Sequence, residues 1–436
     1  MSVTAVEEEA PRLSAEYKKK RWGGIAALSV ATMSDNAEGG LINTLFPVIM
    51  EALNLQLGAL GVMSSISRYA RMIFGTAWSM VADKLGRKRV LVFVTGIWGL
   101  WMAAAGLAQD YTQLLILYSI AVIGTVASEP IMNGLLVDMF EDDERGQAYG
   151  AIRTIAVASG LVITPLIGQL ANIEDGWRYG LYGMGAISLL SGILIVLFVQ
   201  EPPKSAASEL DPESGTFQFK DVGTILKIPT VLLLAVQLLF VTSLVLFAFF
   251  VTYFVQVRGW TTPEAAILNT VFFAGFAIGG FVGGKLGDGF TQKWAAKGRI
   301  ILMQLYLVAF AVMTYLMMQI DWGRGPIVWV VVFVAGLVGS IGFSGCVLPM
   351  VGSVVEPKYA ATAFALLFSF VQGAITATLL LLIGPLVGAL GSLQSVMLWL
   401  VSVPYAINAV FWFLFYKPYP KDVERARARV AAARKV

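Results

Sequence analysis

Histidine is absent from the 436-residue sequence, and cysteine occurs once, at Cys346. Without histidine the chain cannot use a Ser-His-Asp triad, a histidine-ligated metal or an imidazole proton shuttle, and one cysteine excludes a disulfide framework or a cysteine metal cluster. Charge is also scarce: 14% of residues are charged and 57% are hydrophobic, whereas soluble domains have about 25% and about 45–50%. The net charge of +3 gives no strong attraction to polyanions. These absences exclude a soluble enzyme, a disordered chain and a nucleic-acid binder, and they favour a polytopic membrane protein.

Long apolar runs fill most of the chain, and its mean hydropathy is +0.75. A bilayer core is roughly 30 Å thick, so each spanning helix needs about 20 mostly apolar residues. The runs are too long for barrel strands and lack two-residue alternation. We therefore predict an all-α membrane protein with twelve spans, near residues 22–50, 56–82, 89–108, 111–139, 145–172, 177–200, 229–257, 263–287, 299–320, 325–352, 359–388 and 391–416. The charged residues that precede the first span do not resemble a cleavable signal peptide.

Basic residues are distributed unevenly between the predicted loops. With the N-terminus in the cytoplasm, 25 of the 31 Lys and Arg lie on the cytoplasmic side, three lie within spans, and three lie outside, namely Arg178, Arg258 and Arg324. Cytoplasmic loops carry the excess of Lys and Arg in membrane proteins. We therefore expect both termini in the cytoplasm and a multi-pass protein of the plasma membrane, here the inner membrane of a bacterium. The basic tail after the last span sets orientation or, alternatively, contacts lipid head groups.

The chain divides into two related halves. Residues 201–228 are the longest polar stretch between spans, and they separate six predicted spans from six. The loop after span two resembles Gly284–Gly289 after span eight, and Thr164–Gly168 in span five resembles Gly384–Gly388 in span eleven. Such repeats are typical of transporters whose two bundles enclose a site at the midplane. The expected parts are an N-terminal segment (1–21), a first bundle (22–200), a linker (201–228), a second bundle (229–416) and a basic tail (417–436).

The most specific motif is the loop after span two. It reads Ser79-Met80-Val81-Ala82-Asp83-Lys84-Leu85-Gly86-Arg87-Lys88 and resembles the G-x-x-x-D-[RK]-x-G-[RX]-[KR] pattern of the major facilitator superfamily, with Ser79 in place of the first glycine. Gly86 permits a tight turn at this point. The resemblance covers all twelve spans and implies two six-helix bundles, with this loop latching them in an outward-open state; the alternative is a loop that only sets topology. The expected latch residues are Asp83, Gly86, Arg87 and Lys88, with Asp138 at the end of span four and Asp288 in the second half.

Span five resembles a second signature of the same family. Its residues Gly160, Thr164, Pro165, Gly168 and Gln169 follow the Gly-x-x-x-Gly-Pro-x-x-Gly-Gly pattern of proton-coupled antiporters, except that Thr164 and Gln169 replace glycines. Glycine and proline let helices pack closely and bend. The basic residue that such antiporters carry near the start of span four is missing from residues 117–124. Span five therefore favours antiport or, alternatively, only ordinary helix packing, and span four departs from the antiporter pattern.

Ionisable residues inside spans occur only in the first half, where they are Asp35, Glu38, Arg68, Arg71, Glu129 and Arg153. Charges at such positions are costly and mark substrate pathways or proton relays. From the helical rise of about 1.5 Å per residue, we expect three pairs at matched depths, Asp35–Arg71, Glu38–Arg68 and Glu129–Arg153. One interpretation is three structural ion pairs. The other is that a carboxylate, first Asp35 and then Glu38 or Glu129, takes up a proton when an anionic solute binds its arginine partner.

Neutral polar residues on the same faces complete the candidate binding site. In the first half these are Asn36, Asn43 and Asn133, beside Arg68, Arg71 and Arg153. In the second half they are Tyr253, Gln256, Asn269 and Gln372, with aromatic residues such as Phe247, Phe249 and Phe343. A cavity that is charged on one wall and aromatic on the other suits an amphipathic organic solute, including an organic anion. For each aromatic residue, packing within the bundle is the alternative.

The combined expectation is a monomeric secondary transporter that moves a small organic solute by alternating access and is coupled to protons, in the direction of export by antiport. The alternatives are a proton-coupled symporter that takes up an organic anion, and a receptor that binds solute without transport. Na⁺ coupling stays open because Asp35, Asn36 and Asn43 offer oxygen ligands. We expect no enzyme activity, no cofactor and no metal, and the lack of a glycine-rich loop followed by Lys-Ser/Thr argues against ATP-driven pumping.

Overall fold

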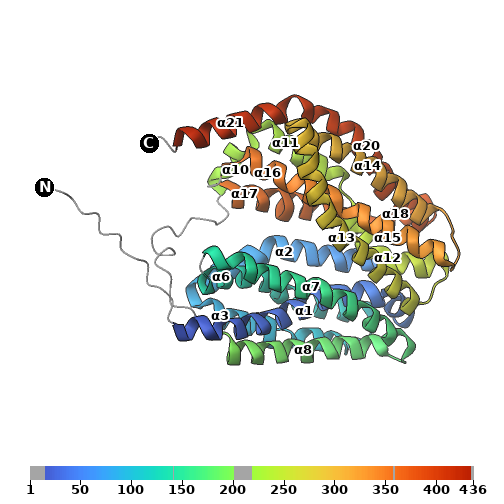
Figure 1. The fold of residues 1–436 in the computed structure, drawn as a ribbon. Coiled ribbons are helices and arrows are strands. Elements are labelled where there is room, and N and C mark those ends of the chain that lie inside the picture. Colours follow the sequence, from blue (N-terminus) through green and yellow to red (C-terminus); the bar gives the residue numbers. More distant parts are fainter. Residues whose placement is uncertain (1–14, 141, 201–218, 357–358, 434–436) are drawn as a thin grey trace.

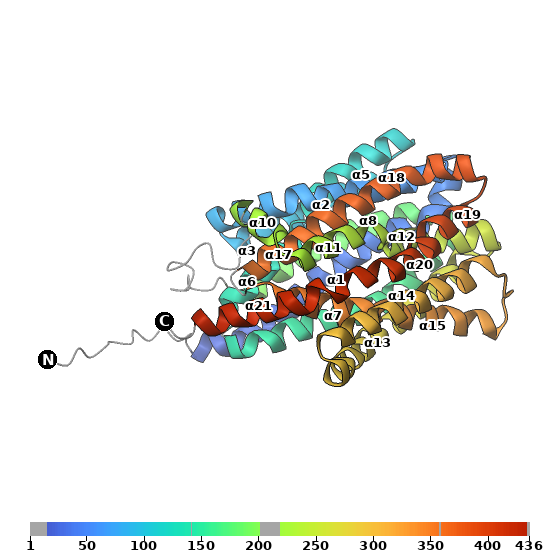
Figure 2. The same ribbon diagram turned by 90° about the horizontal axis from the view of Figure 1, so that it is seen from above.

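Every regular element in the described part of the chain is a helix. The computed structural model describes residues 15–140, 142–200, 219–356 and 359–433. The predictions that concern residues 1–14, most of the linker and the last three residues therefore lie outside the described residues. Figure 1 shows two groups of helices, one from each half of the chain, and in Figures 1 and 2 the start of α1 and the end of α21 lie at the same end of the molecule. We call that end the terminal end and the opposite end the far end.

The first half passes six times between these two ends. The passes are α1 (Ala15–Ala52), α2 (Gly58–Leu85), α3 with η1 and α4 (Arg87–Leu91, Val92–Ile97 and Leu100–Ala105), α5 with α6 (Tyr111–Thr125 and Ser128–Met139), α7 with η2 (Asp142–Gln169 and Leu170–Asn172), and α8 (Gly176–Phe198). The segment η1 is π-helical and η2 is 3₁₀.

The second half also passes six times. It begins with the short helix α10 (Phe219–Leu226) at the terminal end and closes with α21 (Pro418–Ala433). The first three passes between them are α11 (Pro229–Gln237) with η3 (Leu238–Phe240) and α12 (Ser243–Arg258), then α13 (Thr262–Trp294), then α14 (Ala296–Gln319). The fourth is α15 (Pro326–Gly342) with η4 (Phe343–Val347) and α16 (Leu348–Val354), and the fifth is α17 (Ala360–Phe364) with η6 (Ala365–Val371) and α18 (Gln372–Leu390). The sixth is α19 (Leu393–Met397) with η7 (Leu398–Ser402), α20 (Val403–Phe411) and η8 (Trp412–Tyr416).

The prediction of an all-α membrane protein with twelve spans is confirmed. Within the described residues, ten passes are long and apolar enough to cross a membrane. The remaining two, α1 and α2, have 38 and 28 residues and are long enough, but they carry four of the six in-span charges. The ends of most helices fall within a few residues of the predicted span limits, because the polar and glycine-containing turns between the apolar runs are short.

One predicted loop is wrong, since the segment Gly284–Gly289 is helical. The helix α13 continues to Trp294, and the turn falls at Ala295, whose φ is 50°. The physical reason is packing: a Cβ atom on Gly287 would lie 2.2 Å from the carbonyl oxygen of Gly345. Glycine here serves close contact between helices and does not mark the end of a helix.

The contact between α13 and α15 depends on glycines four residues apart. A Cβ atom on Gly275, Gly279 or Gly283 would lie 2.2, 1.9 or 2.6 Å from the carbonyl oxygens of Phe333, Leu337 and Ile341 respectively. Small residues at this spacing allow helix backbones to approach in a membrane, where apolar burial gives little driving force. This row of glycines therefore sets how closely the two helices pack.

The two helix groups touch each other in the half nearer the far end. A Cβ atom on Gly58 of α2 would lie 3.1 Å from the Cα atom of Gly384 on α18, and the Ser65 hydroxyl donates to the Ala377 carbonyl over 2.7 Å. On the other side, a Cβ atom on Gly168 of α7 would lie 2.5 Å from the Cβ atom of Ala266 on α13. Gly168, from the signature in span five, therefore packs between the two halves.

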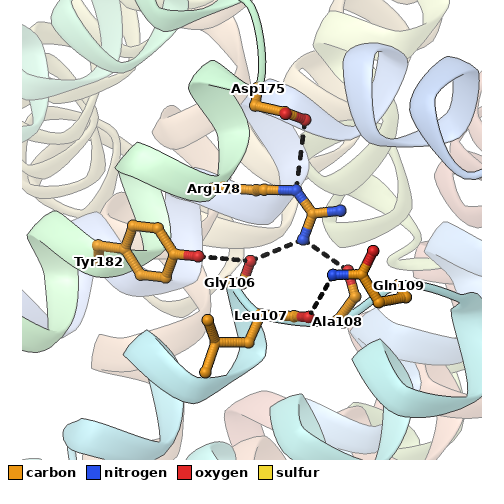
Figure 3. A network of polar contacts seen from close by, with 7 residues as sticks. All are labelled: Gly106, Leu107, Ala108, Gln109, Asp175, Arg178 and Tyr182. Carbon is orange, nitrogen blue, oxygen red and sulfur yellow. Dashed lines mark hydrogen bonds and ion pairs between the residues drawn. The ribbon is translucent and has the colours of Figure 1, made fainter.

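Arginines at the far end donate to carbonyls at or just after helix ends, and Figure 3 shows one of them, Arg178. Arg178, at the start of α8, donates from Nη1 to the carbonyls of Gly106 (2.7 Å) and Ala108 (2.5 Å), which follow α4. The Tyr182 hydroxyl donates to the Gly106 carbonyl as well, and Asp175 accepts from Arg178 Nε over 3.3 Å. One guanidinium therefore supplies donors to two carbonyls of the turn that follows α4.

The other two far-end arginines make the same kind of contact. Arg258 Nη2 donates to the carbonyl of Met318 near the end of α14 over 2.6 Å. Arg324 Nη2 donates to the carbonyl of Gly259, which follows α12, also over 2.6 Å. All three basic residues predicted to lie outside are therefore engaged at helix C-termini, where a positive charge is stabilised by the helix dipole.

Two helices at the terminal end occupy segments predicted only as a linker and a basic tail. Along α21 the residues Tyr419, Asp422, Val423 and Ala426 are buried, a spacing of three and four that marks one face of a helix. This face packs against α11, α14 and α16. The high charge of α21 hides this apolar face from a search for membrane spans.

Candidate functional site

Five of the six in-span charges of the first half gather on the facing sides of three passes. Asp35 and Glu38 lie on α1, Arg68 and Arg71 lie on α2, and Glu129 lies on α6. The central contact is an ion pair in which Arg71 Nη1 donates to Glu129 Oε2 over 2.7 Å. The two side chains are 52% and 63% exposed although neither stands at the end of a pass. The pair therefore lines a space that is open in this conformation.

Asp35 lies next to this ion pair. It is half-buried on α1, interacts electrostatically with Arg71 and Glu129, and lies beside the Ser128 side chain at the start of α6. The Ser128 hydroxyl shares a 2.7 Å hydrogen bond with Thr95 of η1. Arg71 is thus a cation shared between two carboxylates on different passes.

Glu38 is the most deeply buried of the acidic residues in this group. Its side chain is 5% exposed, and neither carboxyl oxygen has a hydrogen-bond partner of good geometry. Its neighbours are Thr125 and Tyr118, and the latter interacts electrostatically with both Glu38 and the half-buried Arg68. An ionised carboxylate in such surroundings carries a large desolvation cost.

One of the three predicted pairs, Glu129–Arg153, was wrong. Glu129 is bound by Arg71 of α2, whereas we expected Arg153 of α7, which lies exposed. Arg71 remains close to Asp35, as expected, but its ion pair is with Glu129. Tyr118 interacts with both members of the expected Glu38–Arg68 pair. Depth along a helix sets the level of a side chain, but the direction in which it points depends on how the helices are arranged around the bundle axis.

The neutral polar residues of the first half divide into two kinds. Asn36 and Asn133 are exposed near the charged residues on α1 and α6. Asn43 is half-buried, and its Oδ1 accepts a hydrogen bond from Ser64 of α2 over 3.3 Å. Asn36 and Asn133 therefore face open space, whereas Asn43 joins two helices.

The candidates of the second half are more dispersed. Gln256 is exposed near the end of α12, Gln372 is half-buried where η6 meets α18, and Asn269 is 9% exposed with an unpartnered Oδ1 atom. Tyr253 is fully buried, its hydroxyl donates to the Met318 carbonyl, and Arg258 stacks on its ring at 5.8 Å. This geometry assigns Tyr253 a structural role between α12 and α14 and counts against its direct contact with a solute.

Aromatic side chains gather at two places in the second half. Phe343 of η4 is 43% exposed and packs edge-on against Phe368 of η6 (5.2 Å between centroids), which stacks with Phe364 at 6.0 Å. Phe247 packs against a buried cluster on α13, and Phe249 is fully buried. The Phe343–Phe364–Phe368 group adds two residues that sequence reasoning missed. The π-helical turns that hold this group change the side-chain direction, and no periodic pattern reveals them.

The motif after α2 forms contacts within the first half. Arg87 pairs with Asp83 (2.9 Å) and donates to the carbonyl of Gly134 on α6 (2.6 Å), while Lys88 donates to the Val196 carbonyl on α8 (3.1 Å). Gly86 has a φ of 98°, so the predicted tight turn is present. In the second half, Asp288 pairs with Arg299 over 3.3 Å. The side chain of Asp138 lies outside the described residues, and the latching of the two halves stays a prediction.

A guanidinium packed on Gly134 was not anticipated. A Cβ atom at Gly134 would lie 2.9 Å from Cζ of Arg87. The glycine therefore allows the arginine to lie flat on α6. In the sequence, a glycine within an apolar run gives no sign of which side chain will cover it.

Curated relatives of this chain include two proteins described as probable transporters and one described as a resistance protein. It is 28% identical over 162 residues to the probable sulfoacetate transporter SauU of Cupriavidus necator, covering 37% of each chain. It is 24% identical over 177 residues to the quinolone resistance protein NorA of Staphylococcus aureus (40% of this chain, 45% of that protein). It is 24% identical over 200 residues to a probable 4-methylmuconolactone transporter of Cupriavidus pinatubonensis, covering 44% of each. The alignments thus span less than half the length of these relatives.

Solved structures resemble the whole fold. A bacterial homologue of the human lysosomal transporter Spinster, in an inward-facing and unoccupied conformation, matches with a TM-score of 0.73 and 18% identity over 94% of this chain and 98% of that chain. The D-xylose–proton symporter matches with a TM-score of 0.71 and 13% identity over 92% and 99%. At this identity the likeness concerns the fold alone. The family model of the Major Facilitator Superfamily matches residues 28–378, and the chain therefore belongs to the Major Facilitator Superfamily.

Proposed function

We propose that this secondary transporter moves a small amphipathic organic solute, with organic anions as the favoured class, and couples its movement to protons. The observation that carries the proposal is the exposed Arg71–Glu129 ion pair, with Asp35 beside it. An arginine presents several donors to a carboxylate or sulfonate. The exposed Phe343 beside Phe368 offers an apolar surface in the other half.

Coupling follows from competition for one cation. In the empty protein, Arg71 neutralises Glu129 and acts on Asp35. An anionic solute that binds Arg71 removes this compensation, so one of the two carboxylates takes up a proton from the open side. Asp35 is our first candidate for this protonation, because Ser128 and both charges surround it. Glu38, buried without a hydrogen-bond partner of good geometry, is our second candidate for protonation.

Two directions of coupling are consistent with this scheme. Export by proton antiport is our first choice, and the likeness of span five to the antiporter signature, together with the relative described as a quinolone resistance protein, supports it. Uptake of an organic anion by proton symport is the second candidate, favoured by the exposed arginines Arg71 and Arg153 and by the relative described as a probable sulfoacetate transporter. We also propose that both termini are cytoplasmic, in which case this conformation is open to the cytoplasm.

Proteoliposomes containing the full chain test the coupling. The probes are sulfoacetate, 4-methylmuconolactone and a quinolone, and the readout is lumenal pH after the addition of each. We expect at least one probe to move protons, Asp35→Asn to abolish that movement, and Arg71→Gln to weaken the affinity for an anionic probe about tenfold, because hydrogen bonds to charged groups contribute about 1.5–3 kcal/mol.

The matched control is Glu51→Gln, an exposed acid at the far end of α1, which should behave like the parent chain. Solute flux that is unchanged by a pH gradient in the parent, or proton movement that persists in Asp35→Asn, Glu38→Gln and Glu129→Gln alike, would contradict the proposal. The sign of the flux driven by an imposed pH gradient separates antiport from symport.

A further inference from the structure

A pocket opens at the terminal end of the second half, away from the charged residues described above. It lies between α10, the start of α11, the neighbouring ends of α16 and α17, and α21, which Figure 1 shows close together. Its charged lining residues are Lys227, Glu356, Asp422, Arg425 and Arg429. Three cations and two acids give the lining a net charge of +1.

Both acids of the pocket are already engaged. Asp422 is 4% exposed and accepts hydrogen bonds from the backbone nitrogen (3.0 Å) and the hydroxyl (2.7 Å) of Thr230, so it caps the start of α11. Arg425 pairs with it over 3.5 Å. Glu356 pairs with Arg429 over 3.2 Å. The acids therefore hold α21 in place and orient the two guanidinium groups.

The cations retain capacity to bind an anion. Arg425 and Arg429 are 67% and 63% exposed, and each guanidinium carries five N–H donors, of which one ion pair uses only part. Lys227 is exposed and forms no ion pair with another described residue. Two oriented guanidinium forks and an ammonium group around one pocket match the geometry and charge of a phosphate group.

The position of the pocket selects the source of that phosphate. The helix α21 follows the last membrane pass directly, with η8 ending at Tyr416 and α21 beginning at Pro418. Its apolar face packs on the bundle, and Lys421, Arg425, Arg427 and Arg429 are exposed. Clusters of four or more basic residues directly beside a membrane span are typical of contact with anionic lipids. We propose that this pocket binds the phosphate group of an anionic membrane lipid.

Native mass spectrometry of the full chain in detergent tests the proposal. The chain is titrated with phosphatidylglycerol or with phosphatidylcholine of the same acyl chains, and the affinity for the first bound lipid is measured. We expect phosphatidylglycerol to bind more tightly than phosphatidylcholine. Lys227→Gln should weaken phosphatidylglycerol binding about fivefold, because a basic residue near the membrane surface contributes about that factor, and it should leave phosphatidylcholine binding unchanged.

Lys297→Gln is the matched control, since Lys297 is exposed near the start of α14 but neither lines the pocket nor belongs to the basic cluster of α21; phosphatidylglycerol binding should be unchanged. Equal binding of both lipids to the parent chain, or an equal loss in Lys227→Gln and Lys297→Gln, would overturn the proposal. Inorganic phosphate that displaces phosphatidylglycerol at a similar concentration would overturn the assignment to a lipid. The midpoint of thermal unfolding verifies that Lys227→Gln is folded.

Discussion

Single arginines at the far end perform a structural task that their charge alone does not suggest. Arg178, Arg258 and Arg324 each donate to carbonyls at or just beyond a helix C-terminus. The guanidinium of Arg178 also lies over the ring of Trp177 at 4.3 Å. The far end carries few basic residues, and these three arginines are accommodated there because their N–H groups bind carbonyls at helix ends.

Replacing Arg178 should destabilise the fold without blocking transport. Arg178→Met keeps much of the apolar stem but leaves the Gly106 and Ala108 carbonyls without the donor that Figure 3 shows. The loss should be about 2 kcal/mol, since hydrogen bonds to charged groups contribute about 1.5–3 kcal/mol. Thermal unfolding in detergent measures it, with the exposed Arg427→Met as control. An equal midpoint in both variants would refute the capping role.

At the scale of residues, the sequence predicts which side chains matter better than it predicts their partners. The charges in the first half were identified from their positions inside apolar runs, and Arg71, Glu129 and Asp35 do lie together. The partner of Glu129 was wrong because depth can be counted along a helix, whereas the direction of a side chain depends on helix packing. Tyr118, between Glu38 and Arg68, gave no signal, since one tyrosine in an apolar run resembles an ordinary packing residue.

Among the elements, α13 shows how the backbone itself forms a packing surface. Its glycines at four-residue spacing place carbonyls of α15 where any side chain would collide. Such close approach stabilises the helix pair in a membrane, because helix association there depends on van der Waals contact. Two glycines of the same helix make a matched pair for testing this, one in the contact and one outside it.

Gly279→Ala should destabilise the chain, whereas Gly284→Ala should not. A Cβ atom at Gly279 would lie 1.9 Å from the Leu337 carbonyl oxygen, but one at Gly284 meets nothing within 4 Å. Overpacking typically costs about 1–3 kcal/mol, while alanine in an open helical position gains up to about 1 kcal/mol over glycine. The thermal unfolding midpoints should therefore move in opposite directions. A similar shift of the same sign in both would show that the close contact does not matter.

Helix positions could be predicted from the sequence, but the details of several helices could not. The length of an apolar run in the sequence directly predicts a membrane span, so the twelve passes could be predicted. The helices α10 and α21 were missed because only one face of each is apolar, as Tyr419 and Val423 show for α21. The segment Gly284–Gly289 was taken for a loop because glycine favours both turns and close helix contacts. The π-helical turns η4 and η6 add a residue to a turn without any change in composition.

At the scale of the whole molecule, the two halves close against each other near the far end. Gly58 meets Gly384, Ser65 donates to Ala377, and Tyr69 shares a 3.0 Å hydrogen bond with Thr378. The exposed Arg71–Glu129 pair stands beyond this closure, on the terminal side. Alternating access requires that these contacts between α2 and α18 separate in part of the cycle.

A disulfide across this contact should stop transport reversibly. In the variant Gly58→Cys/Gly384→Cys, a Cβ atom at position 58 would lie 3.1 Å from the Cα atom of residue 384, within the reach of a disulfide. The native Cys346 is buried and leaves a clean background. Oxidation should abolish solute flux in proteoliposomes, and a reductant should restore it.

The control is Gly58→Cys/Gly373→Cys, because Gly373 lies three turns away on α18 and a Cβ atom there meets nothing within 4 Å. Alkylation of free thiols, counted by mass spectrometry, should show protection only in the first pair. Full flux from the oxidised, cross-linked first pair would contradict the requirement that the far end opens.

The two mouths of the transporter differ in charge. The far-end turns carry six acids, Glu51, Asp110, Glu174, Asp175, Glu264 and Asp321, against the three arginines, so the acids are in excess by three. The terminal end carries most of the Lys and Arg of the chain. The protein is thus a dipole along its own transport axis: an anion is drawn toward the terminal mouth and is repelled from the far one. This field favours one direction of anion movement, because it speeds binding of an anion at the terminal mouth and slows rebinding at the far mouth.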